Sequence, residues 1–212
     1  MTALVWDKVG ERRYETGIDR GVLYLPDGNA VPWNGLTSVV ETRTREVKSY
    51  YLDGIKYLDH SVPGSYVAKL QAYTYPVELD SLLGNADFAP GVVLYDQNSS
   101  WFHLSYRTRI ANDILGTDFG YKIHVVYNVV ASPSDADFET LSDSVAGKPL
   151  EWNLTGTPDP LLGIRPTNHI SLDSTTMDSD TLETLETSLY GSSSADPYLP
   201  KLVDLLNLVA SP

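Results

Sequence analysis

The stretch FGYKIHVVYNVV, residues 119–130, is the segment that decides the fold class. Its side chains alternate in character at every second position, which is the spacing of a β-strand with a buried face. One face carries Tyr121, Ile123, Val125, Tyr127 and Val129, and the other carries Lys122, His124, Val126, Asn128 and Val130. β-Branched and aromatic residues of this kind favour strands. The segment therefore predicts the best-defined β-strand of the chain.

Similar patterns extend outward from this segment over roughly the first 170 residues. The expected strands are Gly21–Leu25, Ala30–Trp33, Tyr66–Tyr75, a short buried strand at Gly91–Tyr95, Trp101–Ile110, Leu150–Leu154 and Thr167–Leu172, with one helical turn at Glu78–Leu83. Glycine and proline separate these runs as turn residues. The 14 tyrosines suit half-buried strands and interfaces. We expect residues 1–176 to form one β-rich domain.

The longest candidate element is a hairpin at about 36–58, with Asp53-Gly54 as its turn. In its first arm, one face carries Val39, Glu41, Arg43, Arg45 and Val47, and the other carries Val40, Thr42, Thr44, Glu46 and Lys48. Neither face of the middle section is apolar, so burial in the domain's own core cannot hold it. This pattern predicts a β-ribbon that projects into solvent or packs on another chain.

Residues 177–212 are expected to be helical. Asp178 is a candidate N-cap residue, an apolar stripe follows at helical spacing, and Gly191 is a natural helix end. A second segment opens at Pro200 and contains Leu202, Leu205 and Leu206. This segment is too apolar to remain in water, so we expect it to dock on its own domain or on a neighbouring chain.

Composition excludes several classes of protein. The chain has no cysteine, which rules out thiol nucleophiles, Cys-ligated zinc and disulfides. Its formal net charge of −13 makes a sequence-reading nucleic-acid binder improbable, because such a surface repels phosphate. No apolar run reaches the roughly 18 residues that a membrane helix needs. We therefore expect an acidic, soluble protein without membrane insertion that assembles inside the cell.

Catalytic motifs are not apparent, and we expect no enzymatic activity, cofactor or metal. The four histidines, His60, His103, His124 and His169, lie on or beside four different expected strands, without a metal-ligand spacing, and we interpret them as ordinary strand residues. An acid glycosidase stays open as an alternative, because it needs only two carboxylates that meet in the fold. We interpret Arg43, Arg45, Arg107 and Arg109 as members of cross-strand or cross-subunit ion pairs.

Several stretches of strand and turn sequence resemble one protein family across nearly the whole chain. They are Gly17–Pro32, Trp33–Leu36, Tyr51–Tyr57, His60, Pro63-Gly64, Tyr73–Pro76, Tyr106–Asn128, Leu154–Pro158 and Leu199-Pro200. The family is that of the major tail proteins, or tail tube proteins, of long non-contractile-tailed phages of actinobacteria.

The resemblance implies a β-sandwich or barrel-like domain with a flanking helix, stacked as hexameric rings around a channel for DNA. It implies that a long hairpin reaches the next ring and that there are no catalytic residues. It also implies a place in the virion after assembly in the host cytoplasm. The implied partners are further copies of the chain, other tail proteins, the tape-measure protein and DNA that passes transiently without sequence-specific contact.

The features that need explanation are a polar-faced ribbon, surplus tyrosines and an apolar tail, and all three indicate contacts between chains. The candidate inter-subunit contacts are Arg43, Arg45, Val47, Tyr50, Tyr51, Asp53, Gly54, Tyr57, Arg107, Arg109, Leu202, Leu205 and Leu206. The hypothesis is a tail tube subunit. The alternative is a minor tail or tail-tip β-sandwich protein that binds carbohydrate or a receptor.

Overall fold

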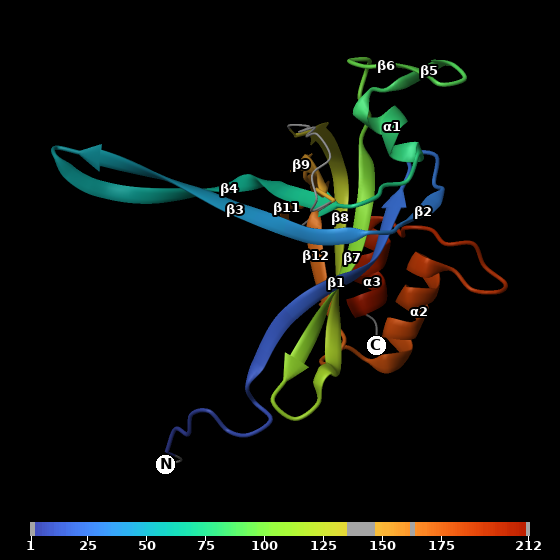
Figure 1. Cartoon of the computed structure of the whole chain (residues 1–212). Coiled ribbons are helices and arrows are strands. Elements are labelled where there is room, and N and C mark those ends of the chain that lie inside the picture. The colour runs from blue at the N-terminus through green and yellow to red at the C-terminus, as the bar shows by residue number, and fades with distance from the viewer. Residues whose placement is uncertain (1–2, 135–146, 162–163, 211–212) are drawn as a thin grey trace.

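Strand β8, Gly116–Pro133, lies at the centre of the fold (Figure 1). The computed structural model describes residues 3–134, 147–161 and 164–210, and within them the side chains of all residues except 43–46, 62–64, 159–161 and 164. The other elements are β1 (Arg13–Tyr24), β2 (Ala30–Trp33), β3 (Leu36–Leu52), β4 (Ile55–Ala72), α1 (Glu78–Leu83), β5 (Ala86–Ala89), β6 (Val92–Leu94), β7 (Phe102–Asn112), β9 (Leu150–Gly156), β10 (Asp159–Leu161), β11 (Ile164–Thr167), β12 (His169–Asp173), α2 (Ser179–Tyr190) and α3 (Leu202–Ala210). The mainly β prediction is confirmed.

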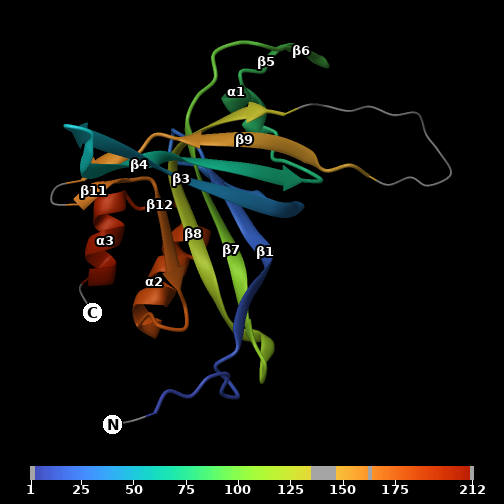
Figure 2. The same cartoon turned by 90° about the vertical axis from the view of Figure 1, so that its left-hand side faces the viewer.

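Eight of these strands form one antiparallel sheet in the order β2-β1-β7-β8-β9-β4-β3, and β12 pairs with β8 beside this path. The middle of β8 pairs with β12, and its last residues, from Val129 on, pair with β9. β8 pairs with β7 and β12 along most of its length and with β9 at its end. The sheet can therefore fold over on itself at β8. Figure 2 shows the result, with β3, β4 and β9 running across β1, β7 and β8.

Both faces of β8 are buried. Val126 and Val129 pack into an inner core between the crossing parts of the sheet, while Ile123, Val125 and Tyr127 pack into an outer core beneath the helices. The expected alternation placed Val129 on the same face as Ile123, Val125 and Tyr127, and this part of the prediction is wrong.

A β-bulge at Asn128 moves Val129 to the inner face. Phe102 pairs with Val129 and Leu104 with Val126, so β8 advances three residues where β7 advances two. Asn128 takes up the extra residue with a φ of 49°, and its N–H donates a 2.9 Å hydrogen bond to Nδ1 of His103. The bulge lets one strand supply apolar side chains to both cores.

Helices α2 and α3 cover the outer core. Asp178 caps α2 by accepting a 3.0 Å hydrogen bond from the Thr181 N–H, as the sequence predicts, and the bonds from Thr181 lower the pKa of that carboxyl. Two buried tyrosines tie the helical segment to the sheet. The Tyr24 hydroxyl donates to the Leu189 carbonyl and the Tyr127 hydroxyl to the Pro200 carbonyl, both at 2.9 Å. The described part of the chain contains no helix of the length and hydropathy that a bilayer crossing requires.

Several strand boundaries and one burial prediction differ from expectation. Strand β1 begins eight residues before Gly21, because its first half pairs with β7 while its side chains stay exposed and give no burial pattern. The expected break before Tyr66 does not occur. β4 continues through Pro63, which lies where β3 is its only partner among the described strands, a position that tolerates proline. Strand β6 is exposed where a buried strand was expected, because its one partner among the strands that the structure describes is the equally exposed β5. The last expected strand is divided between β11 and β12.

Replacing Leu205 with alanine tests whether α3 is part of the folded subunit. Leu205 is fully buried in the outer core, so Leu205→Ala should lower the free energy of unfolding by about 2–5 kcal/mol. Val203, on the same helix, is 53% exposed, and Val203→Ala should change it by less than about 0.5 kcal/mol. Urea unfolding measures both, and equal effects would contradict the docked position of α3.

Candidate assembly interface

The distal halves of β3 and β4 form a two-stranded ribbon that extends away from the rest of the molecule (Figure 1). Pairing with β9 stops at Tyr66, whereas the pairing between β3 and β4 continues to Leu52 and Ile55. From the Arg43–Tyr66 pair to the turn at residues 53–54, therefore, each strand of the ribbon has the other as its only described strand partner. The structure has a hairpin here with its turn at Asp53-Gly54, but the return arm runs to Ala72 and does not end at about residue 58.

The end of the ribbon is a tight hairpin. Asp53 and Gly54 both have positive φ, 50° and 75°, which is the backbone of a type I′ turn and matches the twist of the strands. Two apolar cross-strand pairs follow directly, Leu52 with Ile55 and Tyr50 with Leu58. Such pairs stabilise a hairpin that has no core beneath it.

Large apolar side chains are concentrated at this end. The residues of the apolar tip are Val47, Tyr50, Tyr51, Leu52, Ile55, Tyr57 and Leu58, each between 45% and 73% exposed. Single exposed apolar residues are common on protein surfaces, but seven of them within twelve residues, on the two faces of one ribbon, indicate a contact surface. The tip is consequently a candidate for binding another protein.

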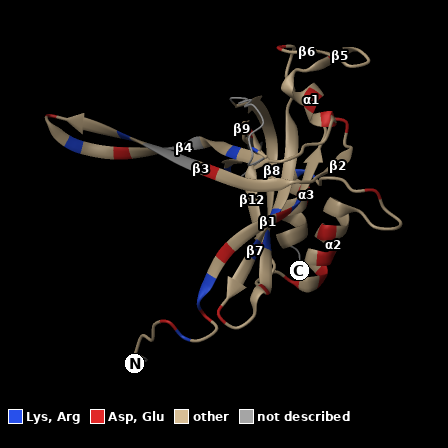
Figure 3. Cartoon of the chain, viewed as in Figure 1, with Lys and Arg blue, Asp and Glu red and all other residues tan. Residues whose placement is uncertain are grey.

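The apolar tip is electrically neutral on a strongly acidic chain. Between residues 47 and 61, Lys48 and Lys56 balance Asp53 and Asp59, whereas the whole chain carries −13. Lys56 Nζ lies 2.6 Å from Asp59 Oδ2, and hydrogen bonds from Lys56 and then Ser49 hold the pKa of the Asp59 carboxyl below its usual value. Figure 3 shows these few charged residues on the ribbon and the acidic residues along α2. A neutral tip can approach another acidic copy with little repulsion.

Most of the sequence-predicted contacts on the hairpin meet at this tip, namely Val47, Tyr50, Tyr51, Asp53, Gly54 and Tyr57. The backbones of Arg43 and Arg45 belong to β3, but their side chains lie outside the described residues. Sequence reasoning omitted Leu52, Ile55 and Leu58 as contacts. Their position on either side of the predicted Asp53-Gly54 turn could have identified them as contacts.

Arg107 and Arg109 belong to an ion-pair network within the chain. Arg107 donates from Nε and Nη2 to the two Asp19 oxygens at 2.6 and 2.8 Å, and Arg109 Nε donates to Asp19 Oδ2 at 3.1 Å. These bonds, led by that from Arg107, hold the pKa of the Asp19 carboxyl below 3.8 despite its partial burial. Arg107 also lies over the Tyr121 ring at 4.7 Å. Both arginines therefore form cross-strand ion pairs, which is one of the two alternatives given in the sequence analysis. A contact of either arginine with another subunit stays a prediction.

The C-terminal leucines are used inside the chain as well. Leu202 and Leu205 are buried in the outer core, and Leu206 packs against it. The segment was expected to dock on its own domain or on a neighbouring chain, and it docks on its own domain. A contact between subunits at these residues stays a prediction that would require α3 to move.

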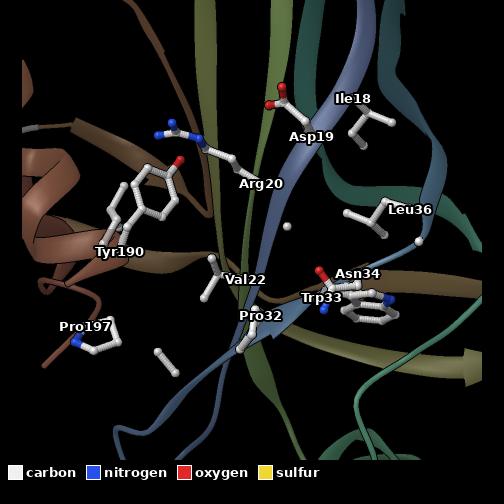
Figure 4. Close-up of a pocket in the computed structure, with 14 residues that line it drawn as sticks. Ile18, Asp19, Arg20, Val22, Pro32, Trp33, Asn34, Leu36, Tyr190 and Pro197 are labelled. Atoms are coloured by element: carbon white, nitrogen blue, oxygen red, sulfur yellow. The ribbon is translucent and has the colours of Figure 1, made fainter. Parts of the chain in front are cut away.

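A groove of about 550 Å³ lies between β1, β2 and the end of α2 (Figure 4). Its lining includes Asp19, Arg20, Trp33 and Tyr190. Trp33 is only 2% exposed, and its indole N–H donates to the Thr74 carbonyl at 3.1 Å, so its ring is a core element and not a stacking platform. The Arg20 guanidinium lies over the Tyr190 ring at 5.4 Å. The groove therefore offers little to a sugar ring.

Within the described residues, Glu41, His124 and His169 form one group whose ligand atoms lie within 4.8 Å of one another. His124 and His169 lie on strands, as the sequence predicts, but the fold also brings them together with Glu41. Three strands distant in sequence bring these side chains together, so no spacing motif could have revealed the group.

Among known proteins, chains similar to this one are found in solved structures. No family model matches the chain, and no curated protein matches it. The tube-terminating cap of the anti-feeding prophage is similar at 13% identity over 82% of this chain and 97% of that chain, with a TM-score of 0.40. A sheath–tube complex of an extracellular contractile injection system, PVC, gives 18% identity over 73% and 88%, with a TM-score of 0.36. The PVC sheath/tube terminator gives 16% identity over 80% and 99%, with a TM-score of 0.34.

Replacing Asp19 with asparagine tests the ion-pair network. Because the pKa of folded Asp19 lies below its unfolded value of 3.8, its stabilisation is complete above pH 3.8 and is lost as pH falls through the lower folded pKa. Asp19→Asn should lower the free energy of unfolding by about 1–3 kcal/mol at pH 7. The difference from the wild type should shrink at about pH 3. Asp118→Asn, at an exposed carboxyl of β8, is the control. Urea unfolding at both pH values measures the effect, and a difference that is independent of pH would contradict it.

Proposed function

We propose that this chain is a structural assembly subunit, the repeating unit of a phage tail tube, and that its ribbon docks on a neighbouring copy. The observation that carries the proposal is the apolar tip, a group of seven exposed apolar side chains on a ribbon that has no core of its own. Burying such a group against protein removes apolar surface from water, at about 25 cal/mol per Å².

The open edge of the sheet at β3 also favours contacts between identical copies. Strand β3 is the last strand of the sheet, with no described strand on its outer side. A long open edge is a liability for a solitary protein, but a closed symmetric ring pairs every such edge with a neighbour. The ribbon gives each subunit one projecting element and requires one receiving surface, which is the arrangement of a head-to-tail contact.

The finer parts of the proposal follow the family resemblance. They are hexameric rings stacked into a tube, a place in the phage virion, contacts with other tail proteins and the tape-measure protein, and transient passage of DNA through the lumen. The acidic composition supports the last of these, because a lumen without net positive charge gives phosphates no anchor.

The alternative is a tail-tip protein that binds carbohydrate or a receptor. It requires an exposed aromatic platform or a concave polar site on a monomer. Trp33 in the groove is buried and cannot serve as such a platform, and the exposed tyrosines of the tip, Tyr50, Tyr51 and Tyr57, lie on a projecting ribbon. Saccharide binding by a protein that remains monomeric would support this alternative over the assembly subunit.

Excising the ribbon tests the proposed docking directly. Arg43 and Tyr66 are cross-strand partners, so residues 44–65 can be replaced by an Asn-Gly turn that joins them. Of the excised residues, those whose side chains are described contribute nothing to the two cores, so the variant should fold with a similar Tm. It should fail to form tubes by negative-stain electron microscopy at concentrations where the intact chain assembles. Tubes of normal length from this variant would contradict the role of the ribbon.

A pair of isoleucines provides a matched test by point substitution. Ile55 and Ile114 are 73% and 63% exposed, and each lies at a tight connection between two strands. Ile55→Asp places a charge in the apolar tip and should weaken assembly at least about tenfold, as measured by sedimentation against concentration. Ile114→Asp should change assembly much less. Equal effects of the two substitutions would show that the tip is not the docking surface.

A further inference from the structure

Glu41, His124 and His169 meet where β3 crosses the sheet. His169 Nε2 lies 3.2 Å from His124 Nδ1 and 3.3 Å from Glu41 Oε1, and His124 Nδ1 lies 3.9 Å from the same oxygen. The side chains are 17%, 10% and 10% exposed for Glu41, His124 and His169. The three ligand atoms thus surround one point that is largely shielded from water.

Neighbouring side chains fix the orientation of this group. Thr108 Oγ1 lies 3.0 Å from His124 Nε2, so this contact occupies the outer nitrogen and leaves Nδ1 directed at the group. The Tyr106 ring stacks on the His124 ring at 4.8 Å and 5°, and its hydroxyl donates to Glu41 Oε1. Tyr66 packs against His169 with ring centroids 5.3 Å apart. Outer partners of this type hold the ligands of metal sites in place.

We propose that Glu41, His124 and His169 bind one divalent transition-metal cation, with Zn²⁺ as the best fit. Zinc binds imidazole nitrogen and carboxylate oxygen at about 2.0–2.2 Å, and tetrahedral geometry then separates the ligand atoms by about 3.3–3.6 Å. Two of the three observed separations lie within about 0.1 Å of this range, and the third requires a closure of a few tenths of an ångström. Two imidazoles and a carboxylate suit zinc and its neighbours in the first transition series better than Mg²⁺ or Ca²⁺.

The charge of the group also favours a cation. An ionised carboxylate is negatively charged, and the Glu41 carboxylate accepts a hydrogen bond from the Tyr106 hydroxyl. His124 Nδ1 and His169 Nε2 face each other, so a proton or a metal ion must lie between or beside them to make the contact favourable. A network held by a shared proton alone is the competing explanation, and direct binding measurements separate the two.

A bound cation would cross-link three strands at the base of the ribbon. Glu41 lies on β3, two residues before Arg43, where the ribbon leaves the sheet, and the histidines lie on β8 and β12. The cation would therefore stabilise the folded chain and restrain the ribbon at its base. This proposal does not depend on the proposed function.

Titration of the full-length chain with ZnCl₂, after dialysis against a chelator, tests the site. Isothermal calorimetry should show one ion per chain, and the Tm should rise by about 5–10 °C at a free Zn²⁺ concentration one hundred times the Kd. Co²⁺ should bind at the same place and develop the visible absorption of an imidazole-ligated ion. No binding of one ion per chain would overturn the proposal in favour of the shared-proton network.

Three variants locate the bound ion. Glu41→Gln keeps the shape of the side chain and an oxygen that accepts from Tyr106, but it loses the charge and should weaken Zn²⁺ binding at least about tenfold. His169→Asn should do the same, and His60→Asn, at an exposed histidine of the ribbon, should leave binding unchanged. If His169→Asn fails to fold, Glu41→Gln together with the wild-type Co²⁺ spectrum decides the question. Unchanged binding in Glu41→Gln, or loss in His60→Asn, would overturn the proposal.

Discussion

Strand β8 has apolar side chains on both faces, and each face requires its own cover. Val126 and Val129 need the inner core, and Ile123 and Val125 need the outer core. An antiparallel sheet usually leaves one face to water, but this strand cannot do so without exposing several apolar side chains. The folding over of β9, β4 and β3 covers one face, and the docking of α2 and α3 covers the other. The bulge at Asn128 makes this division possible by changing the alternation within the strand.

Two of the covering strands, β3 and β4, are much longer than the third, β9. Strand β9 has 7 residues, whereas β3 and β4 have 17 and 18, so both continue beyond the core as the ribbon. An isolated two-stranded hairpin is marginally stable in water. The type I′ turn at Asp53-Gly54 and the apolar pairs beside it hold the ribbon together locally, but these pairs stay exposed. The exposed pairs that stabilise the hairpin thus belong to the surface that we propose docks on a neighbouring copy.

Local signals in the sequence predicted local structure well. Alternation gave the strands, Asp53-Gly54 gave the turn, and Asp178 gave the start of α2. Most of what failed depended on pairing between distant segments, whereas the expected burial of β6 failed although its partner β5 is close in sequence. The first half of β1 is a strand because β7 lies beside it, and its exposed side chains carry no period. The face of Val129 depends on a bulge opposite β7. The grouping of Glu41 with two histidines depends on the path of β3 across the sheet, which no local pattern encodes.

The histidine–glutamate group and the apolar tip lie at opposite ends of the ribbon and act through different physics. The tip would gain free energy by leaving water, whereas the group at the base gains it from directed bonds to a proton or a cation. A bound cation would link the two by restraining the ribbon at its base. Docking of a projecting element costs the free energy needed to order it, and an element that is already fixed at its base loses less freedom when its tip binds. A cation at Glu41 would therefore favour docking at the tip without touching the docking surface.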